Sequence, residues 1–247
     1  MLRPYMRIRL SAQGLVLGFM LTLLVLIGVY HQNIQRLSTA ITLYDTDKIG
    51  HNFLSMYKAF TAKRIDASAK PHYFAVNYQP LPETFEFEGE PLSVEGFLRD
   101  SQSHGLMVVK AGEIVNEQYF LEDKADKQHI SFSIAKSFVS ALFGIAINEG
   151  YITSIDQSVT DYVPELIGSG YDGVRIKDVL QMSSGVKFNE DYGDFFSDIN
   201  RFSRAIALGT SLDAFCASLK REQEPGTYHH YVSIDTQVLG MILTRAT

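Results

Sequence analysis

The most informative part of the sequence is residues 131–148, which read Ser131-Phe-Ser133-Ile-Ala-Lys136-Ser-Phe-Val-Ser-Ala-Leu-Phe-Gly-Ile-Ala-Ile-Asn148. From position 134 onward its apolar residues recur every three or four positions, and Gly150 is a natural helix stop. We therefore predict a helix over 134–148. Because this helix is strongly apolar, we expect it to be buried.

Ser133 and Lys136 form an S-x-x-K motif at the start of this helix. Positions three apart share a helix face, so the hydroxyl and the amine can meet. A serine hydroxyl is a poor nucleophile until a base takes its proton, and lysine is such a base only when its pKa of ~10.4 is depressed. The helix N-terminus adds N–H donors for a developing oxyanion. The plain alternative is a helix cap and a surface lysine.

The sequence holds two further S-x-x-K copies, Ser55–Lys58 and Ser184–Lys187. About one copy is expected by chance in a chain of this length, so context must choose among them. Ser55 lies in a connecting region, and Ser184 is followed directly by Gly185, which breaks helix geometry. Only Ser133 follows a predicted hairpin and opens a long apolar helix.

That hairpin is predicted from residues 105–110 and 113–120, which flank Ala111-Gly112. A short helix capped by Ser93 precedes it over 93–100. The single cysteine, Cys216, excludes an intramolecular disulfide, and its helical surroundings predict a small buried thiol. The last residues, 237–247, also follow a helical pattern.

The N-terminus has the pattern of a membrane segment. Arg3, Arg7 and Arg9 precede an uncharged run whose core, Leu10–Tyr30, is 21 residues long. As a helix this run spans ~31 Å, which matches a hydrocarbon core of ~30 Å. The arginines predict a cytoplasmic N-terminus and an exported domain. An uncleaved anchor is favoured over a signal peptide, although residues 38–40, Ser-Thr-Ala, would suit cleavage.

We therefore expect three parts: an anchor or signal over 1–30, a juxtamembrane connecting region over 31–84, and a domain over 85–247. The predicted location is the cell (inner) membrane, with one span and the domain on the periplasmic or extracellular side. A net charge of −6 argues against a nucleic-acid partner. The seven histidines show no metal-ligand spacing, so we expect no metal site.

Several blocks in order resemble the class C β-lactamase and penicillin-binding-protein superfamily, which has the transpeptidase-like fold. They begin with the hairpin and the S-x-x-K helix. They continue with Asn148-Glu-Gly-Tyr-Ile-Thr-Ser-Ile-Asp156, Ile176-Lys-Asp-Val-Leu-Gln-Met-Ser-Ser-Gly185 and Pro225-Gly-Thr-Tyr-His-His-Tyr-Val-Ser233. The resemblance covers about residues 85–247. It implies an α+β fold, in which an antiparallel sheet with flanking helices accompanies a helical subdomain.

Within that superfamily the chain resembles the 6-aminohexanoate-dimer hydrolase and esterase branch. The resemblance rests on Tyr231-Val-Ser233, on residues 235–240 just after it, and on Asn52-Phe-Leu-Ser-Met56. It implies that Tyr231 shares the base role with Lys136. Ser233 stands where the family usually has Asn, and we expect it to contact substrate. Tyr192, in a polar aromatic loop, is expected to line the pocket.

The resemblance also implies a third motif, Lys-Thr-Gly or a variant, on a later strand, and no part of this sequence matches it. We therefore expect these residues to hold only the N-terminal part of the domain, without the C-terminal strands, and to be a poor catalyst alone.

The expected activity is hydrolysis of a small-molecule ester or amide through an acyl-enzyme on Ser133, without a cofactor. The alternatives are a β-lactamase or cell-wall D,D-peptidase, and a non-enzymatic sensor of the same fold.

Overall fold

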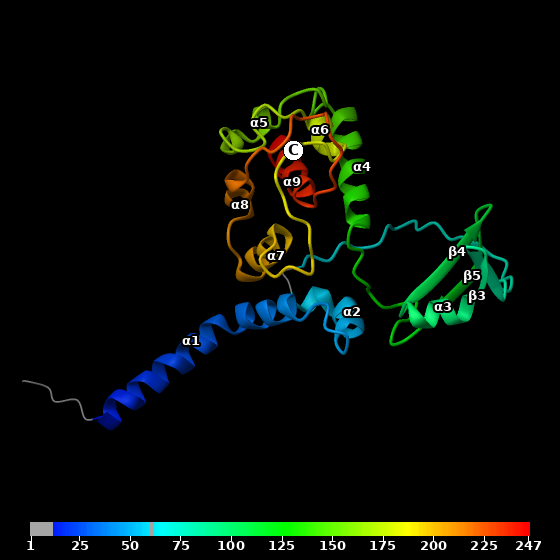
Figure 1. The fold of residues 1–247 in the computed structure, drawn as a ribbon, viewed down its shortest axis with the longest axis horizontal. Helices are drawn as coiled ribbons and strands as arrows, with labels where there is room; N and C mark the ends of the chain where they lie inside the picture. The colour runs from blue at the N-terminus through cyan, green and yellow to red at the C-terminus, as the bar shows by residue number, and fades with distance from the viewer. Residues whose placement is uncertain (1–11, 60–61) are drawn as a thin grey trace, which may run out of the picture.

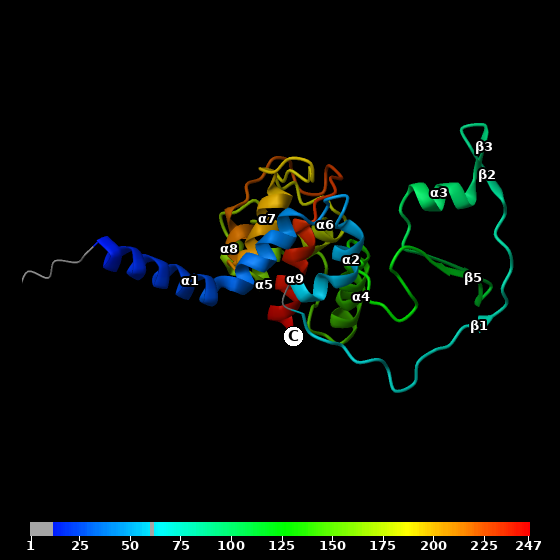
Figure 2. The same cartoon turned by 90° about the horizontal axis from the view of Figure 1, so that it is seen from below.

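The computed structural model describes residues 12–59 and 62–247. Arg3, Arg7 and Arg9, from which a cytoplasmic N-terminus is predicted, therefore lie outside the described residues. A long N-terminal helix, a β unit and a helical unit are arranged side by side in space (Figures 1 and 2). The helices are α1 (Ala12–Ile41), α2 (Ile49–Ala59), α3 (Val94–Asp100), α4 (Ile134–Asn148), α5 (Val159–Tyr162), η1 (Pro164–Leu166), α6 (Ile176–Leu180), α7 (Asp198–Leu208), α8 (Leu212–Ser218) and α9 (Ile234–Ala246). The strands are β1 (Ala75–Val76), β2 (Thr84–Phe87), β3 (Glu90–Ser93), β4 (Gly105–Lys110) and β5 (Glu113–Tyr119).

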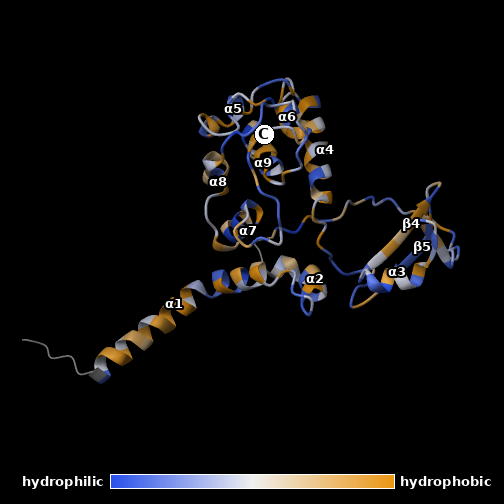
Figure 3. Cartoon of the chain, viewed as in Figure 1, coloured by the Kyte–Doolittle hydropathy of each residue, from blue (hydrophilic) through white to orange (hydrophobic). Residues whose placement is uncertain are grey.

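Helix α1 is long and apolar enough to cross a membrane. Its stretch Gln13–Ile41 has a mean hydropathy of 2.1 in its most apolar part, none of which is buried against the rest of the chain. In Figure 3 the ribbon of α1 is coloured mostly as hydrophobic along the part that extends away from the helical unit. The C-terminal part of the same helix contacts α7, where Asn33 Nδ2 donates to the Leu208 carbonyl at 3.1 Å. A signal sequence near an N-terminus has the same length and composition.

The predicted hairpin is confirmed: β4 and β5 pair antiparallel, with Gly105 opposite Tyr119 and Lys110 opposite Glu113. Ala111 and Gly112, at the turn, both have positive φ, as a two-residue turn of this twist requires. The two-residue strand β1 joins the other side of β5 in parallel, so this sheet is mixed and not wholly antiparallel as predicted. β2 and β3 form a separate hairpin that the sequence interpretation missed.

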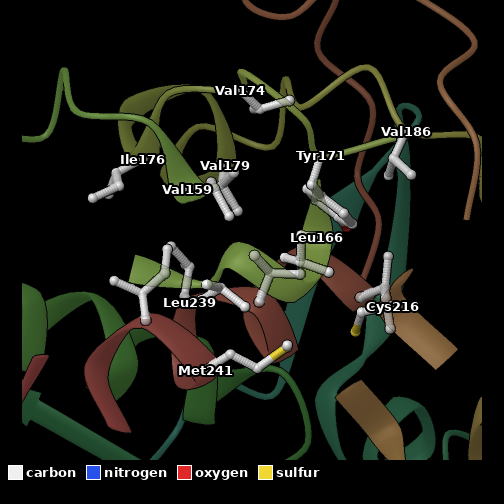
Figure 4. Close-up of a cluster of buried hydrophobic side chains, with 14 of the residues drawn as sticks. Val159, Leu166, Tyr171, Val174, Ile176, Val179, Val186, Cys216, Leu239 and Met241 are labelled. Carbon is white, nitrogen blue, oxygen red and sulfur yellow. The ribbon is translucent and has the colours of Figure 1, made fainter. Parts of the chain in front are cut away.

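The helical unit holds the main core. Helix α9 lies at its centre and contacts α4, α5, α6 and α8. Side chains from all these elements interlock, and those drawn in Figure 4 include Leu166, Tyr171, Leu239 and Met241. The predicted burial of Cys216 is confirmed, since its side chain is fully buried in this core.

The bounds predicted for α4 are confirmed, but its predicted burial is wrong for one face. Phe143 and Ala146 are buried in the helical core. The opposite face carries Ile134, Phe138 and Leu142, which are 65%, 67% and 50% exposed. No element of residues 12–59 or 62–247 covers this face. The apolar periodicity that predicted the helix therefore does not by itself say which neighbour covers it.

The core also encloses the carboxylate of Asp235, in the first turn of α9. It is fully buried and accepts hydrogen bonds of 2.8 Å from the Tyr171 and Ser184 hydroxyls through Oδ1. Its Oδ2 has no partner among the described residues. Burial outweighs the two hydrogen bonds and raises the pKa of Asp235 to about 7. The charged form of this side chain therefore opposes folding.

We predict that Asp235→Asn stabilises the protein more at high pH than at low pH. Because the pKa of Asp235 is raised from 3.8 to about 7, its stabilising contribution is present below pH 4 and is lost as the pH rises through 7. Asparagine stays neutral, so the variant should gain Tm relative to the wild type, by several degrees, between pH 5 and pH 8. Thermal unfolding across this range measures the difference. Asp126→Asn, at an exposed position, is the control, and a Tm difference that does not change with pH would contradict the prediction.

Candidate active site

The predicted nucleophile and its two predicted partners lie together at the N-terminus of α4. Ser133 is the residue before the helix, and Lys136 is three positions further on, so both face the same side. Lys136 Nζ donates to Ser133 Oγ at 2.9 Å. The Tyr231 hydroxyl, from a segment 98 residues away, donates to the same oxygen at 2.7 Å. One hydroxyl thus contacts both an amine and a phenol.

The loop that carries Tyr231 is held by a turn of the backbone at residues 182–185. The Met182 carbonyl accepts from His230 N–H, and the Ser183 carbonyl accepts from Gly226 N–H, both at 2.8 Å. Gly185 has a φ of +74°, and a Cβ there would stand 2.1 Å from the Gln223 carbonyl oxygen. Only glycine allows this approach, which fixes where the loop meets α4.

The residue before the nucleophile, Phe132, has a φ of +43°. A bulky side chain rarely adopts this left-handed conformation, so the surroundings must hold it there. The Phe132 ring packs edge-on against Phe53 at 5.0 Å and stacks on Tyr44 at 6.5 Å. The backbone nearby is tied as well, since Ile130 N–H donates to the Phe53 carbonyl at 3.0 Å. Residues from the juxtamembrane region thus help to set the position of Ser133.

The electrostatics of the site favour the ionised form of Tyr231. Burial alone would raise its pKa, but hydrogen bonding by Lys136 and Ser133, together with the charge of Lys136, outweighs burial and lowers the pKa below 10. Lys136 Nζ also lies 5.1 Å from the centre of the Tyr231 ring. In the described part of the chain, the Ser133 backbone N–H donates no hydrogen bond, so it is available to a ligand at the helix N-terminus.

Ser233 is the residue before α9 and lies two positions after Tyr231, but its hydroxyl is already engaged. Its Oγ donates to Glu190 Oε1 at 2.5 Å, and its N–H donates to Glu190 Oε2 at 2.9 Å. The Tyr192 hydroxyl donates to the same carboxylate at 3.1 Å. Burial and the Glu190 charge raise the pKa of Tyr192 to about 12, so this tyrosine stays neutral. Sequence reasoning missed Glu190, although it noted the polar loop around Tyr192.

An open recess of about 510 Å³ adjoins the nucleophile. Its walls are formed by Tyr44, Phe132, Tyr192 and Gly193, with Ser133 at one side. Tyr192 packs edge-on against Tyr44, with ring centres 6.0 Å apart. The sequence placed Tyr192 beside the pocket but gave no signal for Tyr44, which comes from the region predicted to be only a connection.

The two other S-x-x-K copies have no comparable arrangement. The Ser184 hydroxyl is buried and donates to Asp235, whereas Lys187 is exposed beside Glu222. The Ser55 hydroxyl donates to the His51 carbonyl within α2. Among the described residues, Ser133 alone of the three motif serines faces an amine and a phenol together.

Comparisons with known proteins identify the family of the chain. The beta-lactamase family model matches residues 94–247. The curated 6-aminohexanoate-dimer hydrolase of Paenarthrobacter ureafaciens is 32% identical over 161 residues, and the alignment covers 62% of this chain and 41% of that protein. The chain thus spans less than half the length of this relative.

A solved structure of a Bacillus anthracis protein, provisionally named a 6-aminohexanoate-dimer hydrolase, matches with a TM-score of 0.70 at 19% identity. This match covers 83% of the present chain and 56% of the other, and it shows the shared fold. These findings confirm the resemblance inferred from the sequence. Because the family match covers more than half of the chain, the chain belongs to the beta-lactamase family.

Proposed function

We propose that this chain carries the nucleophile of a serine hydrolase that cleaves ester or amide bonds through an acyl-enzyme on Ser133. The observation that carries the proposal is the pair of hydrogen bonds to Ser133 Oγ, from Lys136 Nζ at 2.9 Å and from the Tyr231 hydroxyl at 2.7 Å. A nucleophile within reach of a base, and a base oriented by a third group, is the arrangement that activated serines require.

In the proposed reaction, the ionised Tyr231 takes the proton of Ser133 while Oγ attacks the carbonyl carbon of the substrate. The carbonyl electron pair moves to oxygen, and the Ser133 N–H stabilises this oxyanion. When the carbonyl re-forms, the bond to the leaving group breaks, and the leaving group takes the proton from Tyr231. Water then attacks the acyl-enzyme by the same path. Lys136 stays charged and stabilises the phenolate, which agrees with the lowered pKa of Tyr231.

The surroundings of Ser133 support small linear esters or amides as substrates. The recess is walled by the aromatic rings of Tyr44, Phe132 and Tyr192, which suits an apolar acyl chain. Ser233 is shorter than an asparagine, and its hydroxyl proton is already donated to Glu190, so it offers the substrate only an acceptor. The curated relative is named for hydrolysis of the 6-aminohexanoate dimer, which favours an amide.

The second candidate function is a β-lactamase, the activity that gives the family its name, or a D,D-peptidase. A third is a sensor that keeps the fold and becomes acylated without turnover. The engaged Ser233 hydroxyl argues against both, because it leaves no side-chain donor at this position for the amide of a β-lactam or peptide.

We further propose that residues 1–30, which include the first part of α1, are an uncleaved membrane anchor and that the catalytic domain, residues 85–247, lies on the exported side. Residues 31–84 connect the two. The contact between α1 and α7 supports an anchor, because cleavage after Ala40 would remove the helix that carries Asn33 and its bond to Leu208. It would also place the new N-terminus only three residues before Tyr44, which lines the recess.

The first prediction concerns the nucleophile. In the full-length protein, a fluorophosphonate probe should label Ser133, Ser133→Ala should abolish labelling, and Tyr231→Phe should slow it by ~10²-fold or more because only the hydroxyl is lost. Ser137→Ala, at an exposed serine one position beyond Lys136, is the matched control and should label at the wild-type rate. Labelling that persists in Ser133→Ala would end the proposal.

The second prediction concerns substrate class. The ratio kcat/KM should be higher for p-nitrophenyl butyrate and for small linear amides than for nitrocefin, because the aromatic recess accepts a linear acyl chain. Steady-state hydrolysis of the three substrates by the same preparation measures this. A clear preference for nitrocefin would favour the β-lactamase. Stable acylation of Ser133 with no turnover of any of the three would favour the sensor.

The third prediction concerns topology. A reporter enzyme fused after Thr247 should be active only in the exported compartment, and the fusion should sediment with membranes after an alkaline wash. A cytoplasmic reporter signal would overturn the orientation. A soluble product whose N-terminus lies near Ile41 would instead show that the helix is removed as a signal sequence.

A further inference from the structure

A second cluster of reactive side chains lies outside the serine site, where the β unit meets α2. His104 precedes β4, Asp123 lies just after β5, and His129 lies in the loop that leads to α4. One ligand atom from each of these residues lies within 4.8 Å of the other two. The His104 and His129 rings pack edge-on at 4.9 Å, and His104 Nδ1 stands 4.0 Å from Asp123 Oδ2.

Asp123 and His129 each use one side-chain atom in a local hydrogen bond, which leaves the second atom of each side chain available as a ligand. Asp123 Oδ1 accepts from the Lys124 N–H at 2.8 Å, and the other oxygen, Oδ2, is the one near His104. His129 Nδ1 lies 2.8 Å from the Ile130 carbonyl oxygen. Because a carbonyl can only accept, the ring proton is on Nδ1, and Nε2 keeps a free lone pair. Metal-bound histidines commonly use such a bond to fix the ring.

His104 gives the second, independent indication of a missing ligand. Its side chain is 11% exposed, its Nδ1 is buried, and this atom has no hydrogen-bond partner among the described residues. A buried polar atom without a partner is costly, and such cases call for an unseen water or ion.

We propose that His104, Asp123 and His129 bind a divalent transition-metal ion of the zinc type. Two imidazoles and one carboxylate suit Zn²⁺, whereas Mg²⁺ and Ca²⁺ prefer oxygen ligands alone. Zinc holds its ligands at ~2.0–2.2 Å, so the three side chains must approach one another by about an ångström on binding. His129 is the exposed member of the three, so its side chain has room for this movement.

A bound ion would join the residue that precedes β4 to two points of the loop 121–132. The cavity beside the cluster, about 340 Å³ and lined by His104 and Glu122, leaves room for a water as fourth ligand. His129 lies four residues before Ser133, so the ion would fix the loop 121–132 that leads to the nucleophile. The sequence interpretation expected no metal, because the three ligands have spacings that no short motif describes.

The test uses the full-length protein, stripped of metal and titrated with Zn²⁺ by calorimetry and with Co²⁺ by visible absorption. We expect one saturable site for Zn²⁺, cobalt d–d bands that Zn²⁺ removes, and no response to Mg²⁺. His104→Ala, Asp123→Asn and His129→Ala should each weaken Zn²⁺ binding by at least ~10-fold. His51→Ala, at an exposed histidine lining the same cavity, is the matched control and should bind as the wild type does.

Limited trypsin digestion supplies a readout that is separate from the two binding titrations. Zn²⁺ should protect Lys124 and Lys127, which are exposed or partly exposed in the loop that the ion would hold, and should leave cleavage at Lys63 and Arg64 unchanged. Circular dichroism of the metal-free variants checks that each one folds. Equal Zn²⁺ affinity in the wild type and the three ligand variants, or binding without protection of the loop, would overturn the proposal.

Discussion

The packing of α9 against α4 is the constraint on which the site depends. Helix α4 carries Ser133 and Lys136, and the segment entering α9 carries Tyr231 and Ser233. Phe143 and Ala146 of α4 share one core with the buried face of α9. Because a packed core transmits small changes in volume, this apolar contact helps to set the 2.7 Å separation of the two hydroxyls.

Polar contacts refine the arrangement that this packing sets. The turn at residues 182–185 holds the loop before Tyr231 through backbone hydrogen bonds, and Glu190 holds the backbone and side chain of Ser233. The same stretch of chain places Ser184 against the buried carboxylate of Asp235. The second S-x-x-K serine is thus used for structure, which shows why identical spacing in a sequence does not give identical chemistry.

Local patterns predicted the elements that local interactions form. The bounds of α4, the β4–β5 turn and the Ser93 cap of α3 could be predicted because helix periodicity, turn glycines and caps involve residues close in sequence. Strand β1 and helix α2 were missed, since the first depends on pairing with a strand about 40 residues away. The outer face of α4 was wrongly predicted to be buried, because apolar character alone does not show which surface covers it.

The candidate site divides in the same way. Ser133 and Lys136 are neighbours on one helix, so their contact could be predicted from spacing. Tyr231 was found through a family resemblance and not from spacing. Glu190, Tyr44 and the His104 cluster could not be found, because each depends on long-range approach of segments with no shared motif.

The unbroken course of α1 from its apolar part to its contact with α7 has a geometric consequence. With α1 as an anchor, a continuous helix and not a flexible linker would join the membrane to the domain. Each residue of an α-helix adds ~1.5 Å of height and rotates the attached domain by ~100° about the helix axis. The number of residues between Tyr30 and the Asn33 contact would therefore set two properties of the recess. These are its height above the lipid and the direction, about the helix axis, in which it opens.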